Sequence, residues 1–204
     1  MTKKITHDDI SHFHDYDLHI PTRTIYMGSV SIEEGNESGV DAKMAERVLK
    51  DLHILDHAAE NGDKPINIIM NNPGGDWYHG MAIHNAIKTC RNYITIIAYG
   101  HAMSMGSIIL QAADERILSE DSSLMMHYGT EAYSGHTQNF IVWAEEAKKT
   151  NKRMEEIYIE RIKEKNPKFR PSDLKKLLTY DKILSAEEAV KLGLCDKILE
   201  GKAE

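Results

Sequence analysis

The residue whose type and position most clearly suggest a role in catalysis is Ser104, which lies between an apolar run and a helical pattern. Residues 93–99 (YITIIAY) form a continuous β-type run closed by Gly100, and the stretch from Met103 to Ala113 can be helical. A serine at such a turn exposes its hydroxyl beside the free N–H groups of a helix start. This position favours a role of Ser104 as a nucleophile. Ala102 stands where the G-x-S-x-G pattern has glycine, so that motif is not met, and a helix cap is the alternative interpretation.

A glycine-rich turn supplies a second chemical element. The apolar run at 66–70 is stopped by Asn71-Asn72-Pro73-Gly74-Gly75, the strongest turn signal in the chain. Glycine at the end of a strand lets another backbone approach closely and present an N–H group toward a substrate carbonyl. Together with an amide beside Ser104, this turn could form an oxyanion hole. Considered alone, this motif is better interpreted as an ordinary turn.

Two further side chains could complete a proton-transfer system. His127 closes the apolar run Leu124-Met125-Met126, where an imidazole could take a proton from Ser104. Asp181 precedes a helix cap and could orient that imidazole, as the third member of a triad does. The alternatives are a packed or solvated histidine and a turn aspartate.

The elements that must position these residues alternate between strand and helix patterns. We predict strands at 23–30, 66–70, 93–99, 115–118 and 124–126, and helices at 44–59, 80–90 and from about residue 103 to 113. Ser172 is expected to cap a short helix, and Ser185 to open another with a capping box. This alternation predicts an α/β fold with a largely parallel sheet covered by helices.

One predicted helix is unusually long and charged. The stretch 138–165 keeps a helical period, yet its polar character leaves few apolar contacts within one domain. We therefore expect it to project from the body or to pack against another subunit.

Composition limits the remaining function classes. The chain has 204 residues, of which 41% are hydrophobic, and this suits one domain with a packed core. Its net charge of −7 argues against nucleic acid as a partner, and two cysteines fit a reducing cytoplasm. No apolar run is long enough for a membrane span or a secretory signal. The histidines and aspartates before residue 20 are irregularly spaced, so we expect a solvated or mobile arm and no metal site.

Four ordered blocks resemble the proteolytic subunit of Clp proteases (ClpP). They are Asn72-Pro73-Gly74-Gly75, Ala102-Met103-Ser104-Met105-Gly106, Leu124-Met125-Met126-His127 and Leu184-Ser185-Ala186-Glu187-Glu188-Ala189. The 29-residue separation of Gly75 from Ser104 equals the family spacing. Four blocks in order, spread over about residues 66–199, are far more specific than any one of them.

The resemblance implies a ClpP/crotonase-like β-α spiral with a projecting handle helix. It implies Ser104 as nucleophile, His127 as general base and acid, Asp181 as its partner, and the amides of Gly75 and Met105 as oxyanion donors. Substrate would pair as an added strand with Asp76, Trp77, Thr130, Glu131 and Ala132. By the same resemblance, residues 1–22 form an N-terminal arm with a weak match to the family's axial segment, and residues 23–204 form the peptidase domain, which includes the handle region at 130–170.

The resemblance further implies a homo-oligomer of two stacked heptameric rings, a Clp-type ATPase as partner and unfolded polypeptides as substrates, with no cofactor or metal. Departures are Asn72 in place of the family's serine, Tyr128-Gly129 in place of Gln-Pro, and apparent insertions at 32–39 and 165–172. The alternatives are an ATPase-independent processing protease such as those of viral heads, a crotonase-like acyl-CoA enzyme, and an inactive ring subunit.

Overall fold

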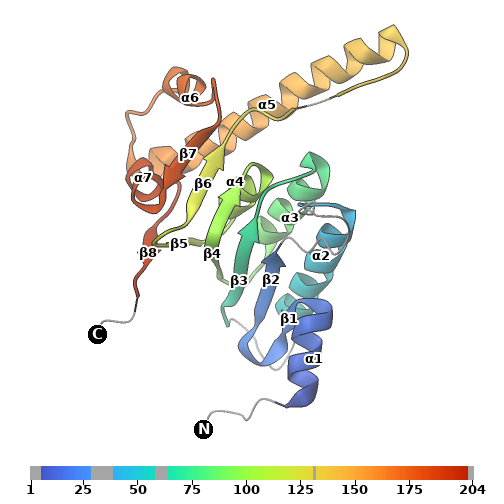
Figure 1. Cartoon of the computed structure of the whole chain (residues 1–204), viewed down its shortest axis with the longest axis vertical. Helices are drawn as coiled ribbons and strands as arrows, with labels where there is room; N and C mark the ends of the chain where they lie inside the picture. The colour runs from blue at the N-terminus through green and yellow to red at the C-terminus, as the bar shows by residue number, and fades with distance from the viewer. Residues whose placement is uncertain (1–5, 29–38, 58–63, 131, 202–204) are drawn as a thin grey trace.

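A single sheet organises the chain in the computed structural model, which describes residues 6–28, 39–57, 64–130 and 132–201 (Figure 1). Its strands run in the order β1-β2-β3-β4-β5-β8, while β6 pairs with β4 and β7 pairs with β6. The strand bounds are β1 Leu18–His19, β2 Thr24–Gly28, β3 Ile66–Asn72, β4 Ile94–Met103, β5 Glu115–Ser119, β6 Ser123–Met126, β7 Lys182–Ser185 and β8 Lys197–Leu199.

Helices cover this sheet and extend beyond it. Their bounds are α1 His7–Tyr16, α2 Ala42–His57, α3 Trp77–Thr89, α4 Met105–Leu110, α5 Thr137–Lys165, α6 Pro171–Leu177 and α7 Ala186–Leu192, with a 3-10 turn at Ile20–Thr22. All strand pairs are parallel except β1–β2 and β6–β7. The predicted α/β fold with a largely parallel sheet is therefore confirmed.

Strand β4 changes partners along its length, and this change brings its end to the chemistry-bearing residues. Its first half pairs with β5, whereas His101 to Met103 pair with Ser123 to Met125 of β6. The register between β3 and β4 also shifts, from Met70 opposite Ala98 to Asn72 opposite Ala102. Such an irregularity redirects a strand. The end of β4 consequently lies between the ends of β3 and β6.

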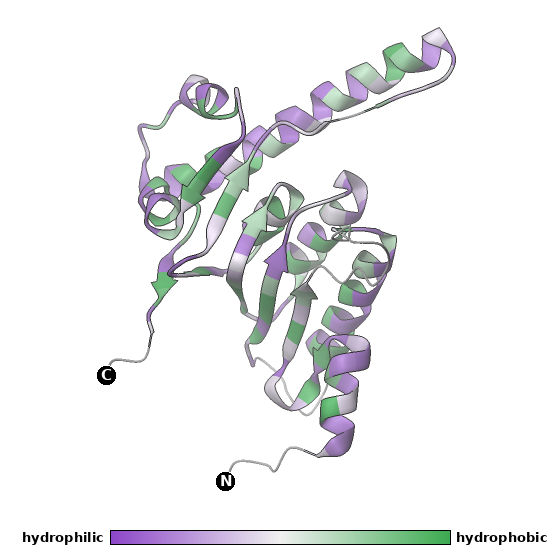
Figure 2. Ribbon diagram, in the orientation of Figure 1, coloured by the Kyte–Doolittle hydropathy of each residue, from purple (hydrophilic) through white to green (hydrophobic). Residues whose placement is uncertain are grey.

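The core lies between the sheet and its helices. Strand β3 alternates strictly, with Ile66, Ile68, Met70 and Asn72 on its buried side, and α2 buries Val48, Leu52 and Leu55. Figure 2 shows apolar residues along the central strands. None of the helices in the described part of the chain combines the length and the apolar character that a membrane span requires.

The long helix α5 projects from the body, as its composition predicts (Figure 1). All of its buried residues, Met154, Ile157, Tyr158 and Ile162, lie in its C-terminal half. The N-terminal half instead exposes four consecutive apolar side chains, at residues 140–143. The helix is thus anchored at one end only within a single chain.

The structure refines one local expectation, contradicts a second and does not describe most of a third. Residues 7–16, expected to be a solvated or mobile arm, form helix α1, which a capping box between Thr6 and Asp9 starts and which buries none of its residues. An ion pair between Asp17 at its end and Arg47 of α2 ties it to the body. Helix α6 begins at Pro171 with Arg170 as its cap, so Ser172 is not the cap. The apparent insertion at 32–39 lies outside the described residues except for Gly39.

Candidate active site

Ser104 occupies a sharp turn between β4 and α4. Its backbone has φ 50° and ψ −122°, a left-handed conformation that a residue with a side chain adopts only when its surroundings enforce it. The Ser104 N–H donates to the carbonyl of Met125 at 2.9 Å. The residue occupies the cap position of α4, but its side chain makes no capping hydrogen bond. The alternative interpretation of Ser104 as a helix cap is therefore wrong.

Strand register brings His127 to this hydroxyl. Met103 of β4 lies opposite Met125 of β6, so the residues that follow these two strands emerge side by side. The distance from His127 Nε2 to Ser104 Oγ is 2.7 Å. An imidazole at this distance can accept the hydroxyl proton as the oxygen attacks a carbonyl.

Asp181 reaches the other nitrogen of the same ring. Antiparallel pairing places Met126 of β6 opposite Lys182 of β7, so His127 and Asp181 are the next residues beyond that pair. Asp181 Oδ1 lies 3.2 Å from His127 Nδ1. A carboxylate there fixes the tautomer that leaves Nε2 free to accept a proton. The side chain of His127 is 24% exposed and that of Asp181 68%, so the carboxylate borders open solvent.

The glycine turn after β3 packs directly against Ser104. A Cβ atom on Gly74, whose φ is 105°, would lie only 2.5 Å from Ser104 Cβ, so the close approach requires glycine. Among the described residues, the amides of Gly75 and Met105 donate to no protein acceptor. Free N–H groups in this position can stabilise an oxyanion formed beside Ser104.

A fully buried amide side chain supports this turn. Asn72 Oδ1 accepts a hydrogen bond from the Gly74 N–H at 2.9 Å, and Asn72 itself has no exposed surface. A Cβ on Gly106 of α4 would lie 2.9 Å from the Asn72 carbonyl oxygen. Asn72 thus contacts both the turn that carries Gly75 and the helix that carries Met105.

Helix α5 holds the start of α4 from the other side. Ser107 Oγ donates to the Ser104 carbonyl at 2.7 Å and shares a hydrogen bond of 2.6 Å with Tyr158 Oη. Burial raises the pKa of the Tyr158 hydroxyl, which keeps it protonated and able to donate. The buried half of the projecting helix therefore helps to position Ser104.

Only some of the predicted substrate-binding residues line the cleft beside Ser104. Asp76, Trp77 and Thr130 line a cleft of about 430 Å³ that also contains Gly75, Ser104 and His127. Ala132 does not line the cleft, and Glu131 lies outside the described residues. Prediction from sequence missed the cleft residues Tyr78, Trp143, Glu146 and Thr150. The last three follow a helical period in α5. This period predicts that they share one face of the helix, but it does not predict that the face borders the cleft.

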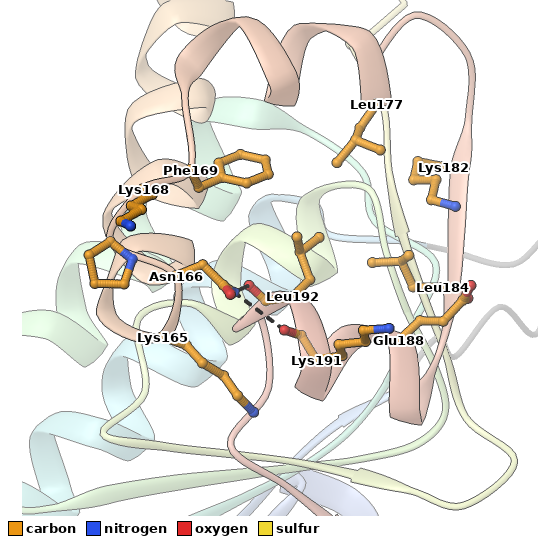
Figure 3. A pocket seen from close by; sticks show the side chains of 11 residues that line it. Lys165, Asn166, Lys168, Phe169, Leu177, Lys182, Leu184, Glu188, Lys191 and Leu192 are labelled. Atoms are coloured by element: carbon orange, nitrogen blue, oxygen red, sulfur yellow. Dashed lines mark hydrogen bonds between the residues drawn. The ribbon is translucent and has the colours of Figure 1, made fainter.

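A larger cleft lies away from these groups. Its volume is about 770 Å³, and it lies between the end of α5, helix α6, strand β7 and helix α7 (Figure 3). Phe169 and Leu184 contribute apolar surface, and neither Ser104 nor His127 lines it. We therefore do not assign the chemistry to this cleft.

Comparison with known proteins agrees with the chemistry that this geometry permits. The family model described as Clp protease matches residues 30–202. The chain is also 31% identical, over 167 residues, to the ATP-dependent Clp protease proteolytic subunit of Deinococcus radiodurans, an alignment that covers 81% of this chain and 78% of the relative. Together with the serine at its strand-to-helix turn, these matches favour a peptidase over the acyl-CoA alternative. The chain therefore belongs to the Clp protease family and is a serine-type peptidase.

Proposed function

We propose that the chain hydrolyses peptide bonds with Ser104 as nucleophile, His127 as general base and then general acid, and Asp181 as the orienting carboxylate. The observation that carries this proposal is the unbroken pair of contacts at 2.7 Å and 3.2 Å. Ser104 Oγ attacks the carbonyl carbon while its proton passes to His127 Nε2. The amides of Gly75 and Met105 stabilise the resulting oxyanion, each contributing roughly 3 kcal/mol.

Collapse of this intermediate breaks the peptide bond. The proton on His127 passes to the leaving amine, and the acyl group remains on Ser104 as an ester. Water then enters and attacks the ester while one of its protons passes to His127 Nε2. Collapse of the second intermediate breaks the ester bond, releases the acid and returns that proton from His127 to Ser104 Oγ. Labelling with a fluorophosphonate, followed by mapping of the modified peptide, tests the assignment. Modification of Ser104 supports it, and modification of a different residue contradicts it.

Substrate would lie extended across the cleft. We propose that Asp76 on one side, and Thr130, Glu131 and Ala132 on the other, pair with the peptide backbone as neighbouring strands. Asp76 is extended, whereas Trp77 is the first residue of α3, so the expectation that Trp77 pairs as a strand is wrong and its contribution is to line the cleft. Support comes from Asp76 and Thr130, which line the cleft beside Ser104. Main-chain pairing of this kind orients the carbonyl group that is attacked, and it depends little on the amino-acid sequence of the substrate.

Asn72 provides a prediction about the geometry of the oxyanion donors. Replacing it with alanine removes the acceptor for the Gly74 N–H, and the turn that presents Gly75 loosens. We expect kcat to fall by about tenfold to a hundredfold with little change in KM, because the donors act on the transition state. Steady-state kinetics on a fluorogenic peptide measure this. Asn72→Ser, which restores an oxygen acceptor, is the matched control and should recover most of kcat; a wild-type kcat in Asn72→Ala would contradict the role.

We also propose that the chain acts in the cytoplasm as a double ring of two stacked heptamers that encloses its active sites. In this arrangement residues 1–22 form an axial segment, residues 23–204 form the peptidase domain, and the handle region at 130–170 joins the rings. Support comes from the name of the Deinococcus relative, a subunit, and from the exposed apolar residues Phe140, Ile141 and Val142 on the unanchored half of α5. Native mass spectrometry tests the assembly, and a particle of fourteen chains is the expected result.

A Clp-type ATPase would deliver unfolded chains to this chamber. The relative is named as ATP-dependent, which supports such a partner. Degradation of a folded reporter protein with and without a Clp-type ATPase and ATP distinguishes this from an ATPase-independent processing protease. Stimulation by ATPase and ATP supports the partnership. Equal degradation without them supports the processing alternative.

A further inference from the structure

The charged side chains that line the cleft beside Ser104 are acidic. Two carboxylate residues, Asp76 and Glu146, line it, whereas no lysine or arginine does so within the described part of the chain. Three aromatic residues, Trp77, Tyr78 and Trp143, belong to the same lining. Aromatic faces and carboxylates both attract cations, and they do so more strongly where water is partly excluded.

Glu146 is the carboxylate that the long helix contributes. One of its oxygens pairs with Lys149 at 3.0 Å, but the Lys149 side chain is 74% exposed, against 36% for Glu146. A pair between side chains so accessible to solvent is weak, and Lys149 does not line the cleft. The carboxylate of Glu146 therefore remains available to a charged group that enters the cleft from a substrate.

We propose that this cleft selects substrates with a cationic side chain, arginine or lysine, at the residue whose carbonyl Ser104 attacks, and that Glu146 determines this preference. The inference rests on the proposed function, because it assigns the substrate class of that same site. A long aliphatic stem suits the aromatic walls, while its charged end meets the carboxylate. Backbone pairing fixes the register of the peptide, and the cleft adds a side-chain preference to it.

Two fluorogenic peptides that differ only by arginine or citrulline at this position test the proposal. Citrulline keeps the shape of arginine without its charge, so the ratio of the two kcat/KM values isolates the charge effect. We expect the wild-type protein to favour arginine by about fivefold to tenfold. The ratio should fall as ionic strength rises, because salt screens the partly exposed pair. Equal turnover of the two peptides would overturn the proposal.

Neighbouring glutamates provide a matched pair of variants. Glu146→Gln should bring the arginine-to-citrulline ratio close to one. Glu145, which pairs with Lys148 and does not line the cleft, serves as the control, and Glu145→Gln should keep the wild-type ratio. A ratio that survives Glu146→Gln, or one that collapses equally in both variants, would contradict the role of Glu146.

A charge reversal guards against an indirect effect of the glutamine variant. Glu146→Lys should favour a peptide with glutamate over one with glutamine at the same position, and an unchanged preference for arginine would count against the proposal. A wrong charge preference can be distinguished from a wrong assignment of the peptidase activity. If the citrulline peptide is cleaved through Ser104 at the same rate as the arginine peptide, the peptidase stands and only the charge preference is wrong.

Discussion

Replacing Ser104 with alanine should reduce peptide turnover by about six powers of ten and abolish fluorophosphonate labelling. The reason is that the hydroxyl oxygen forms the covalent bond to the substrate, and no other described side chain replaces it at 2.7 Å from His127 Nε2. The strained backbone at φ 50° is already enforced by the surrounding packing, so alanine can occupy the same turn. Progress curves over days with a fluorogenic peptide measure the residual rate.

Two controls keep this prediction specific. Ser172→Ala changes an exposed serine of α6 and should leave both turnover and labelling as in the wild-type protein. Thermal unfolding of Ser104→Ala should remain close to that of the wild-type protein, which would separate lost chemistry from lost folding. Turnover that is unchanged in Ser104→Ala would remove Ser104 as the nucleophile.

The register of the sheet explains why the site could be predicted from scattered sequence blocks. Ser104, His127 and Asp181 each stand immediately beside a short strand, and the pairings of β4 with β6 and of β6 with β7 bring those positions together. A resemblance in four ordered blocks is sufficient to identify such positions. Strand β7 itself was not predicted, because Lys182–Ser185 is short and its pairing partner is distant in sequence.

Helix α1 shows where local patterns fail. Its ten residues bury none of their side chains, so no apolar period marks them. The helix depends on the capping box between Thr6 and Asp9 and on the ion pair of Asp17 with Arg47. Asp at the third helical position is a weaker signal than the usual Glu or Gln, and the ion pair is visible only in the folded chain.

The cleft residues of α5 could not be assigned from sequence for a related reason. Trp143, Glu146 and Thr150 share one side of a helix whose outer half has no buried residue. Their relation to Ser104 depends on the direction in which α5 leaves the body. That direction is fixed at its other end, where Tyr158 is buried and bonded to Ser107. The same contact thus positions Ser104, the proposed nucleophile, and orients the helix that borders it.

Replacing His127 with alanine should lower kcat/KM by about four to six powers of ten, because Ser104 then has no group that removes its proton. Asp181 cannot substitute, because its carboxylate lies on the Nδ1 side of the ring and Ser104 on the Nε2 side, so the space left by the missing ring separates them. Labelling by a fluorophosphonate should slow in parallel, as it needs the same activated oxygen. Steady-state kinetics and the rate of labelling measure the two effects independently.

A second histidine supplies the control for this variant. His53 is exposed on α2 and stacks on His57, away from the cleft lining, so His53→Ala should keep wild-type turnover and labelling. Because the proposed oxyanion donors belong to the backbone of Gly75 and Met105, His127→Ala should still bind a peptide aldehyde non-covalently. Turnover within tenfold of wild type in His127→Ala would mean that a different base activates Ser104, and the 2.7 Å contact would then have no catalytic role.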